Sequence, residues 1–474
     1  MKALIATKPR IFAAALFALA LLLSGCNVGP NYVRPQMTAP PAYRAADNAT
    51  ASNTDVNSLG DQDWSKVFRE PELQELIRTA LDKNFDIRIA AQRVLEQQAQ
   101  VRITRSQEFP TVSVGGTGIG ADLPNSLGSG LPSGANAAGS FNLSAAWNPD
   151  FWGLYRRQTE AARAQMLAQT WAQRAVRMTL VQQVAAAYFQ LRFLDQQLEI
   201  AKATLKTRHE STELTRTLES GGSVPLSDLR QAEELEYTAS AQIPQIEQQI
   251  QQEENGLRLL LGQAPGPVAH TDPAALNPPP QDLPVGLPSR LLERRPDILQ
   301  AEQQLIAANA QIGVARAQFF PQLSISASGG VGGNDWATLF DPGSRLIYAV
   351  GSLTQPIFEG GRLRGQLQLS EHTKEEMVLN YQKTITEAFR DVSNALVAVN
   401  KQRAAREQQE KLVAAARDAS QLARTRYQGG ATSYIEVLTN DSNLFSAQLN
   451  LVATQEGEAL SLVQLYGALG GGWE

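Results

Sequence analysis

The hydrophobic positions of the chain repeat with a helical period over two very long segments. In the second segment, steps of three and four residues separate Val378, Tyr381, Ile385, Phe389, Val392, Leu396 and Val399. Residues 366–428 around them contain neither Gly nor Pro. This spacing predicts an amphipathic helix with a near-heptad seam. At 1.5 Å per residue, such a helix extends over roughly 95 Å, far more than a helix of an ordinary globular domain.

A corresponding segment lies about 208 positions earlier, which indicates an internal repeat. Residues 154–220 also lack Gly and Pro, and the pair Gly221-Gly222 that follows them corresponds to Gly429-Gly430. The residues before the two segments correspond as well, because PDFWG at 149–153 aligns with PIFEG at 356–360. We therefore interpret the chain as a duplicated long-helix unit.

A second pattern, with a period of two residues, follows Phe109-Pro110 and Phe320-Pro321. The apolar positions of this pattern are Val112, Val114, Phe141, Leu143, Ala145 and Trp147 in the first repeat, and Leu323, Ile325 and Ala327 in the second. Gly-rich loops are expected at about 115–139 and about 329–344, and an apolar run at 346–353 completes the second pattern. Each repeat thus predicts one β-hairpin, at about 109–152 and about 320–357, with strands of about ten residues.

The predicted strands have one apolar face and one face of small polar residues. This alternation is typical of strands that separate lipid from water. A hairpin packed on a soluble core has the same pattern and is the alternative interpretation. Four strands cannot close a barrel wide enough for a channel, and open strand edges are not tolerated in lipid. If these strands lie in a membrane, several chains must share one barrel.

The N-terminus has the pattern of a signal peptide over residues 1–25. Basic residues precede an apolar run of about 13 residues, which is too short to span a bilayer. Leu23-Ser24-Gly25-Cys26 resembles the lipobox of bacterial lipoproteins, so we expect Cys26 to carry S-diacylglycerol and an N-acyl chain such as palmitate. An ordinary signal peptide with an incidental Cys is the alternative. Asn27 is not the Asp associated with inner-membrane retention, which implies the outer membrane.

Composition and the internal repeat divide the rest of the chain into an N-terminal arm, two repeats and a linker between them. Residues 26–70 are rich in Pro, Ala, Asn and Thr and predict an extended, lipidated arm. The first repeat spans 71–262 and the second 290–474. Between them, the linker 263–289 contains eight prolines, which favour an extended connection rather than a domain.

The composition indicates neither an enzyme nor a nucleic-acid-binding protein. The net charge is -5 and no dense basic run occurs. His209, His270 and His372 are scattered, and Cys26 is the only Cys, so no metal site of Cys and His is expected. No catalytic set and no phosphate-binding loop emerge. The Gly pairs are better explained as tight turns at helix ends.

Several short motifs together resemble one protein family. They are CNVGPNY at 26–32, RPDI at 295–298 with Ala301-Glu302, Phe320-Pro321, PIF at 356–358 with Gly360-Gly361, and Tyr427 with Gly430 before Ser433-Tyr434-Ile435. In this order and at duplicated spacing, they resemble the outer-membrane factor family, the TolC-like channels of Gram-negative efflux and secretion systems. The lipidated, NodT-type branch is the most similar. The resemblance covers nearly the whole mature chain.

The resemblance implies a mainly α fold with a small β part. In the family, a homotrimer shares one transmembrane β-barrel of twelve strands, and its helices form a periplasmic α-barrel. Residues 158–220 and 366–428 would then be the long helices. The shorter helices, stacked end to end in pairs, would be near 71–107 with 224–262, and near 290–318 with 433–467.

The same resemblance implies a passive exit duct, not an enzyme, without cofactors other than the lipid. Its partners would be a periplasmic adaptor (membrane fusion) protein, an inner-membrane resistance-nodulation-division pump and outer-membrane lipid. A lipid-anchored coiled-coil scaffold without a pore is the alternative, and a periplasmic lipoprotein enzyme is a third hypothesis. The exported compound and the identity of the pump stay open.

The resemblance also implies two functional sites at the helix tips. Gly221, Gly222, Gly429 and Gly430 would mark the turns that contact the adaptor. In the family, a Tyr before the tip Gly and an Asp on the partner tip help to close the pore, and Tyr427 and Asp228 occupy these positions.

Acidic residues near the second tip complete the candidate gate. Glu436 matches the first of two acidic residues that face the pore in some members of the family. The second falls on Thr439, and a basic residue found nearby falls on Thr432. Asp441 would substitute only if its face turns inward. In a trimer, three Glu436 carboxylates near the axis would favour cations.

Overall fold

The computed structural model describes residues 27–37, 39–40, 42–44, 58–120, 137–269, 284–333 and 338–473. Cys26 and His270 lie outside these ranges. The chain forms two compact units. The hairpin unit comprises Met1–Gln36, Val94–Gln169 and Ala301–Tyr381, and the tip unit comprises Met37–Arg93, Thr170–Gln300 and Gln382–Glu474.

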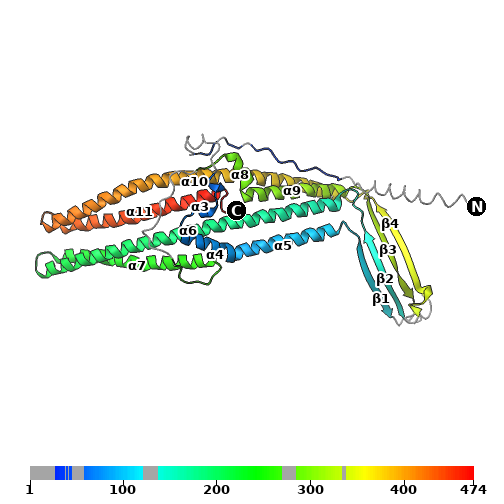
Figure 1. Ribbon diagram of the computed structural model, residues 1–474, viewed down its shortest axis with the longest axis horizontal. Helices are drawn as coiled ribbons and strands as arrows, with labels where there is room; N and C mark the ends of the chain where they lie inside the picture. The colour runs from blue at the N-terminus through cyan, green and yellow to red at the C-terminus, as the bar shows by residue number, and fades with distance from the viewer. Residues whose placement is uncertain are drawn as a thin grey trace, which may run out of the picture. The chain divides into compact units, whose positions relative to one another are not determined.

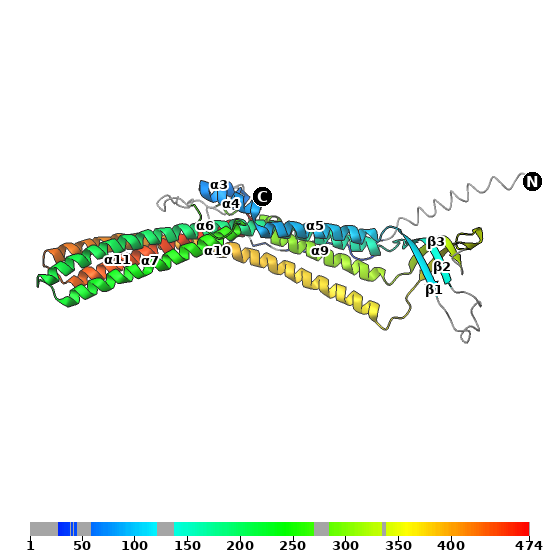
Figure 2. The same cartoon turned by 90° about the horizontal axis from the view of Figure 1, so that it is seen from below.

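Two helices of 67 residues dominate the chain, as the repeat predicts (Figure 1). They are α6 (Leu154–Ser220) and α10 (Arg362–Gln428). Each is followed by a tight turn and a helix of 35 residues that runs back beside it, α7 (Leu226–Leu260) and α11 (Tyr434–Ala468) (Figure 2). Among the described residues, no helix is both long enough and apolar enough to cross a membrane.

The helix that the sequence predicts near 71–107 is in fact two helices, α4 (Pro71–Lys83) and α5 (Phe85–Ser106). The buried Asn84 separates them. Its side-chain oxygen accepts hydrogen bonds from the N–H groups of Asp86 (2.8 Å) and Ile87 (3.2 Å), and its amide donates to the Leu260 carbonyl (2.9 Å). Asn84 thus caps α5 and ends α4, a role that apolar periodicity does not reveal.

The second repeat is interrupted in the same way, and the prediction of one helix near 290–318 is also wrong. The chain forms α8 (Pro288–Arg294) and α9 (Pro296–Ala317). Arg295 between them is extended, with φ -68° and ψ 123°. A residue before proline avoids the helical region because the proline ring clashes with it.

The strands form one four-stranded antiparallel sheet in the order β1-β2-β3-β4. Their bounds are Thr111–Gly120, Ala137–Trp147, Gln322–Gly333 and Arg345–Thr354. The loops expected from about 115 and about 329 therefore begin later than predicted. Backbone pairing does not require side chains, and a Cβ at Gly330 would lie 2.0 Å from the Phe141 carbonyl. Glycine at this point of β3 permits close strand pairing.

The register of the sheet confirms the alternation that the sequence predicts. Val114, Leu143 and Gly329 follow one another across neighbouring strands on the apolar face. On the opposite face, paired serines form hydrogen bonds of 2.8 Å: Ser113 with Ser144, and Ser324 with Ser352. Each hairpin comes from one repeat, and pairing of β2 with β3 joins them.

Candidate functional site

The two helix tips have the same backbone geometry. At the first tip, the N–H of Gly222 donates to the Glu219 carbonyl and the N–H of Ser223 to the Leu218 carbonyl, both at 2.8 Å. At the second tip, Gly430 donates to Tyr427 (2.9 Å) and Ala431 to Arg426 (2.8 Å). These are the paired hydrogen bonds of a Schellman motif, which ends a helix on a left-handed residue.

Only one glycine of each tip pair needs a left-handed conformation. Gly222 has φ 74° and Gly430 has φ 68°, whereas Gly221 and Gly429 have no positive φ. No atom lies within 4 Å of a Cβ built at Gly222 or Gly430. The tips are therefore sterically open while their backbone is constrained.

The aromatic contact at the second tip is a ring contact rather than a hydrogen bond. The rings of Tyr427 and Tyr434 lie 5.1 Å apart, and both pack with a small cluster that includes Ala232 and Val437. The Tyr427 hydroxyl is buried and has no hydrogen-bond partner among the residues that the structure describes. Its burial, and then the charge of Asp228, raise the pKa of Tyr427. The fold thus brings Tyr427 near Asp228 without a hydrogen bond from the Tyr427 hydroxyl.

Glu436 has a cation partner within its own chain. Arg426 in the last turn of α10 donates to the Glu436 carboxylate at 2.7 Å, and the Thr432 hydroxyl also donates to this carboxylate. The Thr439 hydroxyl instead donates to the Ile435 carbonyl (2.8 Å). Arg426, and not a residue at position 432, is therefore the cation beside Glu436. Sequence reasoning missed it because the pair spans the turn between two helices.

The Asp441 carboxylate on α11 is bound by two side chains of α10. The Arg424 guanidinium donates to both of its oxygens, at 2.8 and 3.3 Å, and the Ser420 hydroxyl donates at 2.6 Å. The Asp441 side chain is only 12% exposed. Charge-assisted, bidentate bonding of this kind fixes the carboxylate in one orientation.

One polar contact joins the two repeats close to the second tip. The hydroxyls of Ser211 on α6 and Tyr434 on α11 lie 2.8 Å apart. No repeat or motif in the sequence signals this pair, because its members come from different repeats and from unlike positions within them.

The arm that follows Cys26 binds to a buried guanidinium in the hairpin unit. Arg157, whose side chain is 2% exposed, donates to the carbonyls of Val28 (3.3 Å) and Gly29 (3.4 Å) and to the side chain of Asn31 (3.0 Å). Gly29 has φ 105°, and a Cβ there would lie 2.5 Å from the Gly313 backbone. The first described residues of the arm are therefore fitted closely to this unit.

In the described ranges, no group of three or more His, Cys, Asp or Glu residues is placed to hold a metal ion. The lipidation predicted at Cys26 falls outside those ranges.

Comparisons with known proteins agree with this architecture. The sequence matches the family described as outer membrane efflux protein over residues 76–263 and 287–471. It is 35% identical over 463 residues to the cation efflux system protein CusC of Escherichia coli O6:H1, which covers 97% of this chain and 98% of CusC. It is 37% identical over 462 residues to the solvent efflux pump outer membrane protein SrpC of Pseudomonas putida, with 97% of both chains covered.

The fold is also similar to a solved structure. The open state of the MtrE outer membrane channel of Neisseria gonorrhoeae superimposes with a TM-score of 0.80 at 28% identity. This similarity covers 95% of the present chain and 99% of the MtrE chain.

Proposed function

Because the chain belongs to the outer membrane efflux protein family and is an outer-membrane efflux protein, we propose that it forms, as a homotrimer, the passive exit duct of a tripartite efflux system. A periplasmic adaptor and an inner-membrane resistance-nodulation-division pump would deliver the substrate. Most of the selectivity would lie in the pump, because a wide water-filled tube can conduct a substrate without binding it.

The sheet is the observation that carries this proposal. It has one apolar face, one serine-rich face and two outer strands, β1 and β4, that pair on one side only within the described chain. Unpaired strand edges are not stable in lipid, so a sheet of this kind needs the strands of other copies. A shared barrel satisfies both edges and encloses the polar face.

Conductance in a planar bilayer, combined with native mass spectrometry, tests the proposal. We expect trimers in detergent and discrete ion-conducting events from the same preparation. A stable monomer without conductance would instead support a lipid-anchored coiled-coil scaffold.

The two faces of β2 are expected to respond oppositely to charge. Leu143→Arg places a guanidinium on the apolar face near the middle of the strand, and we expect the assembled barrel to be about 2–4 kcal/mol less stable. Ser144→Arg is the matched control because its side chain lies on the opposite face. It should leave trimers intact and alter single-channel conductance. Equal loss of trimers in heat-modifiability gels would contradict this assignment of the faces.

The lipid on Cys26 is proposed to be one of two attachments to the membrane. A single acyl chain binds a bilayer marginally and several chains bind firmly, while the shared barrel holds the protein independently. We expect a Cys26→Ser variant, if its signal peptide is still removed, to stay largely in the outer-membrane fraction. Complete release to the periplasm would show that the lipid alone provides attachment.

The helix tips are proposed to contact the helical hairpin of the adaptor. Bulky substitutions such as Gly222→Leu and Gly430→Leu should reduce efflux while trimers still assemble. The open space at both positions accommodates the side chain, while its left-handed conformation costs about 1–2 kcal/mol. Gly221→Ala and Gly429→Ala are matched controls without a positive φ. Unchanged efflux in both leucine variants would place the docking surface elsewhere.

A further inference from the structure

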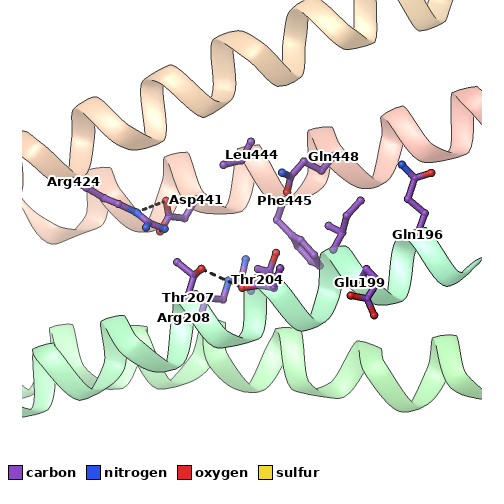
Figure 3. Close-up of a pocket in the computed structure, with 12 residues that line it drawn as sticks. Gln196, Glu199, Thr204, Thr207, Arg208, Arg424, Asp441, Leu444, Phe445 and Gln448 are labelled. Atoms are coloured by element: carbon purple, nitrogen blue, oxygen red, sulfur yellow. Dashed lines mark hydrogen bonds and ion pairs between the residues drawn. The ribbon is translucent and has the colours of Figure 1, made fainter. Parts of the chain in front are cut away.

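A cavity of about 570 Å³ lies in the tip unit, between α6 and the pair of α10 and α11 (Figure 3). Its apolar wall includes Ile200 and Ala203 of α6 and Leu444 and Phe445 of α11. This volume is in the range of sites that hold organic molecules of moderate size. Tyr427, Glu436, the tip glycines and the arm-binding Arg157 do not line the cavity, whereas the gate candidate Asp441 does.

Most charges that line the cavity are already paired. Arg424 forms an ion pair with Asp441 at 2.8 Å, which Figure 3 shows at one end of the cavity. Glu199 on α6 lies 3.9 Å from the Lys202 ammonium. One further charged side chain lines the cavity, and it is the guanidinium of Arg208.

Arg208 is buried without a carboxylate partner. The residue is 5% exposed, one terminal nitrogen donates to the Leu235 carbonyl (2.7 Å), and its Cζ lies 5.1 Å from the centre of the Phe445 ring. Its Nε is buried and has no hydrogen-bond partner within the described parts of the chain, which also supply no ion pair. Burial lowers the pKa of Arg208, and the charge of Asp441 acts in the opposite direction.

A buried guanidinium is unfavourable unless an anion completes its bonding. Arg208 remains charged, because arginine does not lose its proton in proteins at ordinary pH. Carboxylates match the planar arrangement of guanidinium donors and bind it through two parallel hydrogen bonds. The aromatic ring beside Arg208 and the apolar wall around it favour a ligand with a hydrophobic body.

We propose that this cavity is a binding site for amphipathic organic anions, in which the acidic group pairs with Arg208 and the apolar body packs against Phe445 and Leu444. The site would give the duct a ligand preference of its own, independent of the pump. Ligand binding rests on the cavity and on Arg208, whereas its consequence for the duct rests on the function proposed above.

The test is isothermal titration calorimetry of the full-length protein in lipid nanodiscs, with 1-naphthoate as the probe and empty nanodiscs as the baseline. We expect saturable binding with one site per chain. The neutral analogue 1-naphthalenemethanol should bind at least tenfold more weakly, since it cannot pair with a guanidinium. No saturable binding of 1-naphthoate, or equal binding of both compounds, would overturn the proposal.

Variants locate the binding site. Arg208→Met should weaken binding of 1-naphthoate at least tenfold, whereas Arg216→Met, an exposed arginine two turns further along α6, should leave it unchanged. If Arg208→Met does not fold, Ala203→Leu tests the same site, because it fills the cavity while the charge remains. It should also weaken binding at least tenfold. Unaltered affinity in the folded Arg208 or Ala203 variant would refute this location.

Discussion

Replacing Glu458 by Ala is expected to lower the free energy of unfolding by about 2–4 kcal/mol. The Glu458 side chain is 3% exposed and accepts hydrogen bonds from Arg403 (3.4 Å) and Arg406 (2.6 Å), which join α11 to α10. Removing the carboxylate leaves two cations that have lost their shared partner. Both arginines are 26% exposed and reach water, which keeps the loss below that of a fully buried pair.

The matched control for Glu458 is Glu410. It is paired with the same Arg406 at 2.6 Å, yet its side chain is 46% exposed. Exposed ion pairs contribute about 0–1 kcal/mol, so Glu410→Ala should change stability little. Thermal unfolding of the detergent-solubilised protein, followed by circular dichroism at 222 nm, measures both variants. Similar shifts for the two would mean that burial of Glu458 is not what makes its ion pairs important.

Replacing Arg426 by Gln is expected to raise the resting conductance of the channel about fivefold. In the trimer that we propose, the change leaves three Glu436 carboxylates without their cation, and their mutual repulsion destabilises the closed state. Three half-exposed pairs together contribute about 1 kcal/mol, which corresponds to that factor. Cation selectivity should increase as well, because the local field becomes more negative.

Glu436→Gln should have the opposite effect on selectivity and open the pore little. The double variant Arg426→Gln with Glu436→Gln should return conductance towards that of the parent, since both members of the pair are then neutral. Arg417→Gln, an exposed arginine on the same helix, is the control. Tyr427→Phe alone should change little, because the hydroxyl has no hydrogen-bond partner among the described residues. Combined with Asp228→Ala, it tests whether the polar groups at this contact, rather than the ring of Tyr427, help to close the pore. Single-channel recording measures conductance and reversal potential. If Arg426→Gln leaves both unchanged, the constriction lies elsewhere.

Local periodicity in the sequence determined the main elements of this protein. The long helices were evident because a run such as 366–428 keeps a helical period without Gly or Pro. The hairpins were evident because Leu143 and Ser144 alternate on a two-residue period, and the sheet places them on opposite faces. Duplication of both patterns, together with ordered short motifs, was sufficient to identify the family and its function. Each pattern is visible within one continuous segment of the chain, and the duplication is visible when two such segments are compared.

The tertiary structure alone decided which distant side chains meet. Asn84 interrupts an apolar pattern that continues on both sides of it. The Gly-rich ends of β1 and β3 have no alternation of apolar and polar side chains, so the sequence did not predict them as strand. Arg426 reaches Glu436 across a turn, and Arg403 and Arg406 meet Glu458 from another helix. Arg208 is one of many arginines in the sequence, and only burial beside Phe445 distinguishes it. The physical reason is that a charge pair or a buried charge depends on distance and solvent exclusion, which periodicity along the chain does not specify.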